Sequence, residues 1–228
     1  MKENDFTLNS INPMIGVGTR IEEPANKVRL DIKNIEEYLK KGYMANADDF
    51  RTYEVNRLNM RVLVQRDYGE ENDCSLVSIT TIIDYYTNHK YEIEEIYDKV
   101  VDIAKRYGYN GETYGTISLT IKKILQRAYA EFKINKPAKE KLFKNLGYSY
   151  DFIKKRIDMG APMILSMWDD GRNYYRNHSV TIIGYRTFLL SKGNDILKLP
   201  TLMVYDNWYK STGYIDFTQL GVISSINY

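Results

Sequence analysis

Residues 177–185 read Asn-His-Ser-Val-Thr-Ile-Ile-Gly-Tyr, an apolar run that begins just after one of the two histidines of the chain. Valine, isoleucine, threonine and tyrosine are residues that strands favour, and the run has the length of a buried strand. The sequence therefore predicts a strand over residues 179–185, with His178 at its start.

The sequence changes character near residue 162. Before that point apolar residues recur at the spacing of amphipathic helices, and after it they fall in short runs separated by turn-forming residues. This order predicts an α+β fold, in which a helical first half packs on an antiparallel sheet or barrel. The predicted helices cover residues 31–41, 74–86, 93–107, 116–132 and 150–159; the predicted strands cover residues 163–168, 179–185, 202–205 and 214–217, with an extended segment at 53–65 and turns at 169–171, 191–194 and 211–213.

The composition argues against several kinds of site. The chain carries 32 basic and 30 acidic side chains, a net charge of +2, so we expect no nucleic-acid partner. Cys74 is the single cysteine, which excludes an internal disulfide. With two histidines beside it, a zinc site built from several Cys and His ligands is excluded as well. We expect neither a metal nor a cofactor.

The hydropathy pattern contains no targeting or membrane signal. The first ten residues are polar, and the longest apolar runs are far shorter than the ~20 residues of a membrane-spanning helix. We therefore expect a soluble protein without a membrane span or a signal peptide in this sequence. Such a chain would reside in the cytoplasm or be exported after removal of a leader.

Cys74 begins the predicted helix 74–86, directly after the capping pair Asn72 and Asp73. The free N–H groups of the first turn and the helix dipole favour a negative charge at this place. We therefore expect a lowered pKa and a nucleophilic thiolate, which the neighbouring carboxylate of Asp73 opposes. The alternative is a buried cysteine that only fills space in the core.

His178 is the candidate base, because His89 lies at a polar helix end and is expected to face solvent. Asp206 and Asn207 follow the strand 202–205. A side-chain oxygen of one of them is expected to accept the second ring N–H of His178 and so fix its tautomer. The order Cys, His, then Asp or Asn predicts a catalytic triad, with a structural core histidine as the alternative.

These segments resemble those of the papain-like cysteine peptidases. Residues 177–185 look like the histidine strand of that family, and residues 205–208 with 213–215 are similar to its Asn-Ser-Trp segment and following Gly-Tyr-Ile strand. In this match Asp206 takes the orienting position and Trp208 that of the tryptophan that shields it from water. The helix-Gly-Pro-strand element over residues 157–165 is closer to the bacterial peptidase C39-like branch, which commonly uses aspartate as the third member.

The resemblance covers roughly residues 60–220 and implies a papain-like fold with an oxyanion site. In such enzymes a glutamine upstream of the cysteine donates to the oxyanion beside the N–H of the cysteine. Gln65 is the matching glutamine, nine residues before Cys74, and the long spacing implies an inserted turn at 68–71. Asn72 is the local alternative. Ser75 stands where this branch usually has glycine.

The resemblance also implies a function by acyl transfer. The Cys74 thiolate would attack a carbonyl to form a thioester, and His178 would protonate the leaving group and activate the second nucleophile. Water in that role makes a cysteine peptidase with a peptide or protein substrate. An amine makes an acyltransferase or transglutaminase-like enzyme, and an inactive peptide-binding module is a third reading. Residues 51–228 would form the catalytic domain, and residues 1–50 an N-terminal arm.

Overall fold

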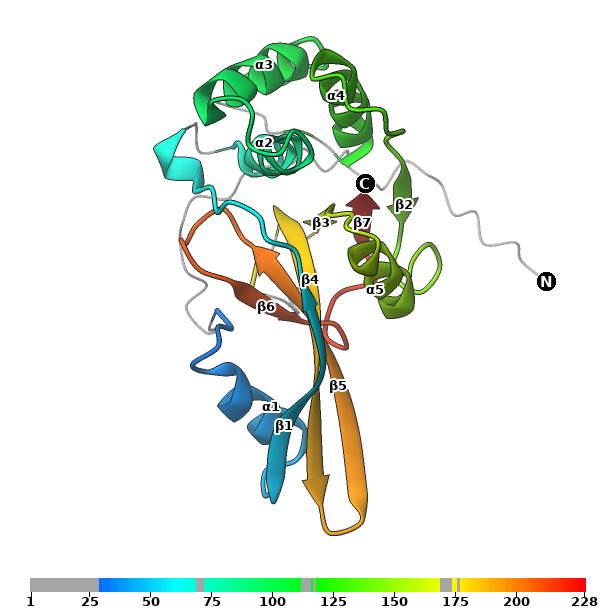
Figure 1. The fold of residues 1–228 in the computed structure, drawn as a ribbon. Coiled ribbons are helices and arrows are strands. Elements are labelled where there is room, and N and C mark those ends of the chain that lie inside the picture. Colours follow the sequence, from blue (N-terminus) through cyan, green and yellow to red (C-terminus); the bar gives the residue numbers. More distant parts are fainter. Residues whose placement is uncertain (1–28, 69–71, 112–115, 117, 169–173, 176) are drawn as a thin grey trace, which may run out of the picture.

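The computed structural model describes residues 29–68, 72–111, 116, 118–168, 174–175 and 177–228. The predicted α+β class is confirmed, because helices precede an antiparallel sheet (Figure 1). The helices are α1 (Ile35–Tyr43), α2 (Cys74–Tyr86), α3 (Ile93–Lys105), α4 (Ser118–Glu131) and α5 (Tyr150–Asp158), with a 3-10 turn η2 (Gln65–Asp67). The strands are β1 (Asp49–Arg57), β2 (Glu140–Leu142), β3 (Met163–Met167), β4 (His178–Lys192), β5 (Asp195–Tyr205), β6 (Gly213–Asp216) and β7 (Ser224–Asn227).

The sheet is organised around the long strand β4. Its strand order is β2-β7-β3-β4-β5-β6, and β1 pairs with the far part of β4, beyond the part that pairs with β3. All of these pairs are antiparallel. The β4–β5 hairpin turns at Gly193 and Asn194 and, together with β1, extends well beyond the other strands of the sheet (Figure 1).

Two apolar cores flank the central strands. The first lies between α2, α3 and α4, where the fully buried Leu76, Ile79 and Ile83 of α2 meet side chains of the other two helices. The second lies on the sheet and includes residues of α1 and α5. In Figure 1, α2 lies between the α3–α4 pair and one end of the sheet, and α1 and α5 lie on either side of the β1–β4–β5 ribbon. The helix that begins with Cys74 is therefore enclosed by helices and sheet.

The N-terminal part of the described chain packs into the sheet core. Leu30, Ile35 and Leu39 are buried there, and the N–H of Tyr214 in β6 donates to the carbonyl of Leu30 at 2.9 Å. The proposed boundary at residue 50 falls inside β1 and stays a prediction. Residues 30–43 nevertheless share one core with the sheet.

The predicted elements differ from the observed ones mainly at their ends. The first helix begins at Ile35 rather than at residue 31, because the Asp31 carboxylate accepts N–H groups of Lys33 and Asn34 in a preceding turn. Strands β2 and β7 were not predicted, and β4 and β5 are longer than expected. Residues 1–28 of the predicted N-terminal arm and the predicted turn at 169–171 lie outside the described residues. Among the helices described, none is long and apolar enough to cross a membrane.

Gly184 is expected to be essential for the close approach of β1 to β4. A Cβ at this position would lie 2.5 Å from the carbonyl oxygen of Asn56. We expect Gly184→Ala to lower the free energy of unfolding by about 2 kcal/mol, measured by urea denaturation. Gly42→Ala is the control, because a Cβ there meets nothing within 4 Å and alanine favours the helix. Equal stability of the two variants would contradict this account.

Candidate active site

Cys74 begins α2 as predicted, but its neighbour Asp73 does not cap the helix with its side chain. The buried Asp73 carboxylate accepts hydrogen bonds from the hydroxyls of Tyr97 in α3 and Tyr109 after it. The start of α2 is thereby fixed to the helical layer. The Asp73 carboxylate, predicted as a candidate cap of α2, instead joins the start of α2 to α3 and to the segment that follows α3.

The Cys74 thiol is buried, with 8% of the residue exposed, and the backbone and side chain of Ser179 are near enough to oppose part of the effect of burial on its pKa. Burial raises the pKa of the thiol, and the charge of Asp73 adds to the shift. The expected thiolate is therefore wrong for this resting state. Removing the sulfur from water disfavours the anion by more than the helix terminus and Ser179 favour it.

His178 starts β4 and is also buried. Its Nε2 lies 2.7 Å from the carbonyl oxygen of Asp206, which can only accept, so Nε2 carries the proton and Nδ1 is the free basic nitrogen. Burial lowers the pKa of His178 to about 4, so the imidazole is neutral at pH 7. The indole of Trp208 stacks on the ring at a centroid distance of 4.1 Å. Trp208, which was expected to shield Asp206 from water, therefore covers the ring of His178.

Asp206 approaches His178 through its main chain. Its carboxylate, expected to accept the ring N–H, is instead bound at 2.5 Å by Nε of Arg29. The hydroxyl of Tyr175 donates to the same carboxylate oxygen at 3.2 Å, and the N–H groups of Trp208 and Tyr209 donate to the other, each at 3.1 Å. The carboxylate therefore organises the loop, and the carbonyl of the same residue orients the imidazole.

Asn207 joins the cysteine helix to the histidine strand, a role that the sequence did not reveal. Its Nδ2 lies 2.8 Å from the carbonyl of Cys74, 2.9 Å from Oγ of Ser78 and 3.1 Å from the carbonyl of Ser179. Its backbone is left-handed, with φ at 63°. Asparagine tolerates this conformation well, but an Asp-Asn pair after a strand does not disclose which side chain turns inward.

Gln65 is brought to the same loop, whereas the amide of Asn72 is directed elsewhere. The backbone N–H of Gln65 donates to the carbonyl of Asn207 at 2.7 Å, and Gln65 is buried. The Nδ2 of Asn72 donates to the carbonyl of Gly111 at 2.9 Å, in the segment after α3. The role of Gln65 as the oxyanion donor stays a prediction. The inserted turn assumed between it and Cys74 includes residues 69–71, which lie outside the described part.

His89 is separated from this site by the length of α2. Its Nδ1 lies 2.7 Å from the buried carboxylate of Asp84 near the C-terminal end of the helix. At 1.5 Å per residue, that end is about 18 Å from Cys74. His89 is therefore paired and partly exposed rather than simply solvated, and it takes no part in the cluster.

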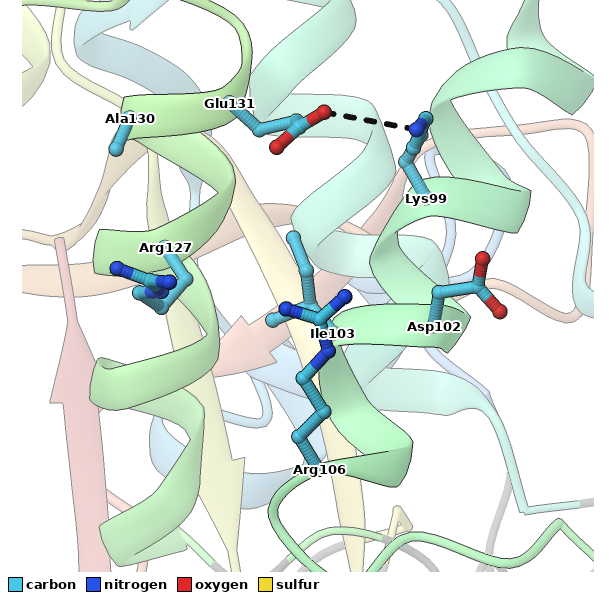
Figure 2. A pocket seen from close by; sticks show the side chains of 7 residues that line it. All are labelled: Lys99, Asp102, Ile103, Arg106, Arg127, Ala130 and Glu131. Carbon is cyan, nitrogen blue, oxygen red and sulfur yellow. Dashed lines mark ion pairs between the residues drawn. The ribbon is translucent and has the colours of Figure 1, made fainter.

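A shallow hollow lies between α3 and α4 (Figure 2). Lys99 and Glu131 form an ion pair at 3.6 Å across it, and Arg106 and Arg127 contribute further charge. Both basic and acidic side chains line this hollow. It includes no member of the cluster around Cys74.

Comparison with known proteins gives a family for most of the chain. Residues 57–220 match the model of the Peptidase_C39 like family, which spans the segments of Gln65, Cys74, His178 and Asp206. No curated protein and no solved structure matches the chain. The match indicates a function of the cysteine-peptidase type.

The pKa of His178 predicts an acid-labile contribution to stability. Below pH 6.5 the unfolded imidazole takes up a proton, whereas the buried imidazole stays neutral until pH is about 4. We therefore expect its contribution to the free energy of unfolding to fall by up to ~3 kcal/mol between pH 7 and pH 4. Urea titrations should show a shallower pH dependence for His178→Gln than for the wild type. Identical profiles for His178→Gln and wild type would contradict the buried neutral state.

The raised pKa of the thiol predicts slow alkylation at neutral pH. The rate of iodoacetamide labelling should rise about tenfold per pH unit and level off only above pH 9, because the thiolate is the reacting species. Mass spectrometry reports Cys74 alone, since the chain has one cysteine. A labelling rate that is already constant between pH 5 and pH 7 would show a preformed thiolate and contradict this prediction.

Proposed function

Because the chain belongs to the Peptidase_C39-like family, we propose that it cleaves peptide bonds through a thioester on Cys74. One observation carries the proposal: the side chain of Asn207 contacts the carbonyls of both Cys74 and Ser179, and so joins the start of the cysteine helix to the strand that begins with the buried His178. A helix-borne cysteine against a sheet-borne histidine is the arrangement of a papain-like fold. The substrate is a peptide or a protein.

The first step starts from two neutral groups. As Sγ of Cys74 attacks the carbonyl carbon, its proton passes to Nδ1 of His178, which is the unprotonated nitrogen of the ring. The new S–C bond turns the carbonyl oxygen into an oxyanion. The N–H of Cys74, which has no acceptor within its own helix, and the amide of Gln65 stabilise that charge.

The later steps return the proton. The imidazolium gives it to the amine of the leaving peptide as the C–N bond breaks, which leaves an acyl thioester. Nδ1 then takes a proton from water, whose oxygen attacks the thioester, and the acid product departs as Cys74 regains its proton. The carbonyl of Asp206 keeps the ring oriented, and the negative carboxylate of the same residue favours the transient imidazolium.

The peptidase proposal predicts that hydrolysis depends on both residues. Cys74→Ala should abolish cleavage of unfolded casein or of a mixed fluorogenic peptide library, and His178→Gln should lower kcat at least ~10²-fold. His89→Gln is the matched histidine control and should retain the wild-type rate. Both readouts need a reducing agent, because oxidation removes the nucleophile.

Three results would overturn the assignment. Hydrolysis that survives in Cys74→Ala would exclude the thioester route. Release of the leaving group that requires an added amine such as glycinamide would identify an acyltransferase with the same residues. Peptide binding without cleavage, equal in wild type and Cys74→Ala, would identify an inactive module.

A further inference from the structure

The carboxylate of Asp206 has a cationic partner from the N-terminal part of the chain. Asp206 is completely buried, and Nε of Arg29 lies 2.5 Å from its Oδ2, with only 9% of the Arg29 side chain exposed. A carboxylate buried without a counter-charge would be strongly destabilised. Arg29 is the basic side chain that neutralises it in the described structure.

The Arg29 side chain contacts both ends of the loop between β5 and β6, residues 206–212. Its Nη2 donates to the carbonyl of Ser211 at 2.9 Å, and its guanidinium lies over the ring of Tyr209 at 4.6 Å. The next residue, Leu30, pairs with Tyr214 at the start of β6. The side chain therefore links the first loop residue, Asp206, to the last part of the loop before β6.

Because Gly213 has no side chain, the side chains of Arg29, Asp206 and Tyr175 have room to meet beside it. A Cβ on Gly213 would lie 2.6 Å from the hydroxyl oxygen of Tyr175 and 3.3 Å from both Nη2 of Arg29 and Oδ2 of Asp206. Three polar groups thus converge where any larger side chain would displace them. This close packing indicates a fixed arrangement, not an incidental surface ion pair.

We propose that Arg29 is a positioning residue of the catalytic site, acting through Asp206 on His178. The inference rests on the proposed peptidase function. Arg29 holds the Asp206 carboxylate in the orientation that accepts the N–H groups of Trp208 and Tyr209. That orientation places the Asp206 carbonyl on Nε2 of His178 and keeps the indole on the ring. Arg29 lies outside residues 57–220, so the site depends on a residue that the family match does not include.

Loss of Arg29 should impair the chemical step more than substrate binding. In the full chain, we expect Arg29→Ala to lower kcat about tenfold or more with KM within about twofold, because it acts on the base and not on the substrate. Without the cation, the charge of Asp206 acts on His178 unopposed and raises the pKa of the imidazole, so the acid limb of the activity profile should move to higher pH. Millimolar guanidinium should restore part of kcat, and Arg29→Lys should be intermediate.

The matched control is Arg51→Ala, an exposed arginine whose partner is the exposed Asp49. It should leave kcat and the pH profile unchanged. A kcat for Arg29→Ala equal to or above that of the wild type would overturn the proposal, as would a loss confined to KM. If Arg29→Ala does not fold, an Arg29→Lys variant with wild-type kcat and pH profile would overturn it as well.

A second readout separates this proposal from the peptidase assignment. Nuclear magnetic resonance of 15N-labelled histidine reports the Nε2–H of His178 and its hydrogen bond without any turnover. We expect the signal of the buried Nε2–H to be lost or shifted in Arg29→Ala and retained in Arg51→Ala. A signal unchanged in Arg29→Ala overturns the positioning role even if the wild type proves inactive, and a changed signal supports it in that case.

Discussion

The side-chain amide of Asn207 connects the helical and the sheet parts of the molecule at one point. It contacts the carbonyl of Cys74 in α2 and that of Ser179 in β4, and the main-chain carbonyl of Asn207 accepts the N–H of Gln65. The left-handed backbone at Asn207 makes this possible, because it turns the chain after β5 so that Asp206 faces His178 while Asn207 points between the layers. The relative position of nucleophile, base and oxyanion donor depends on this one turn.

Burial determines the charge state of the resting site. Both Cys74 and His178 are removed from water, and each pKa moves in the direction that disfavours its charged form. A neutral thiol and a neutral imidazole therefore coexist at pH 7. In the proposed reaction, charge would arise only during attack on the carbonyl, where the proposed oxyanion donors and the Asp206 loop would stabilise it.

The sequence was sufficient for the local features of the fold and of the site. Apolar periodicity and a capping pair located the helix at Cys74, and a β-branched run located the strand at His178. Strand β7 was missed because its residues Ser224–Asn227 are mostly polar yet fully buried, so no apolar run marks them. Its pairing with β2 and β3 depends on neighbours that are distant in the sequence.

The contacts around Cys74, His178 and Asp206 depended on tertiary structure and could not be read from spacing. Which oxygen of Asp206 meets the imidazole is decided by the backbone turn at Asn207 and by Arg29, 177 residues earlier in the chain. The direction of the shift in the pKa of Cys74 required its burial, which a position at a helix start does not reveal. Sequence patterns report which residues are available, and packing decides which of their atoms meet.

The pairing of β4 on both edges has a consequence for how a substrate gains access. This strand carries His178 at one end and is hydrogen-bonded to β3 and β1 along one edge and to β5 along the other. Residues 181–192 are paired with β5 and residues 178–182 with β3, so this strand separates only together with its neighbours, and His178 is held by β3. The 8% exposure of Cys74 must therefore increase by a displacement on the helical side or in the adjoining loops. In the proposed peptidase, substrate would enter by such a displacement while His178 stays paired with β3.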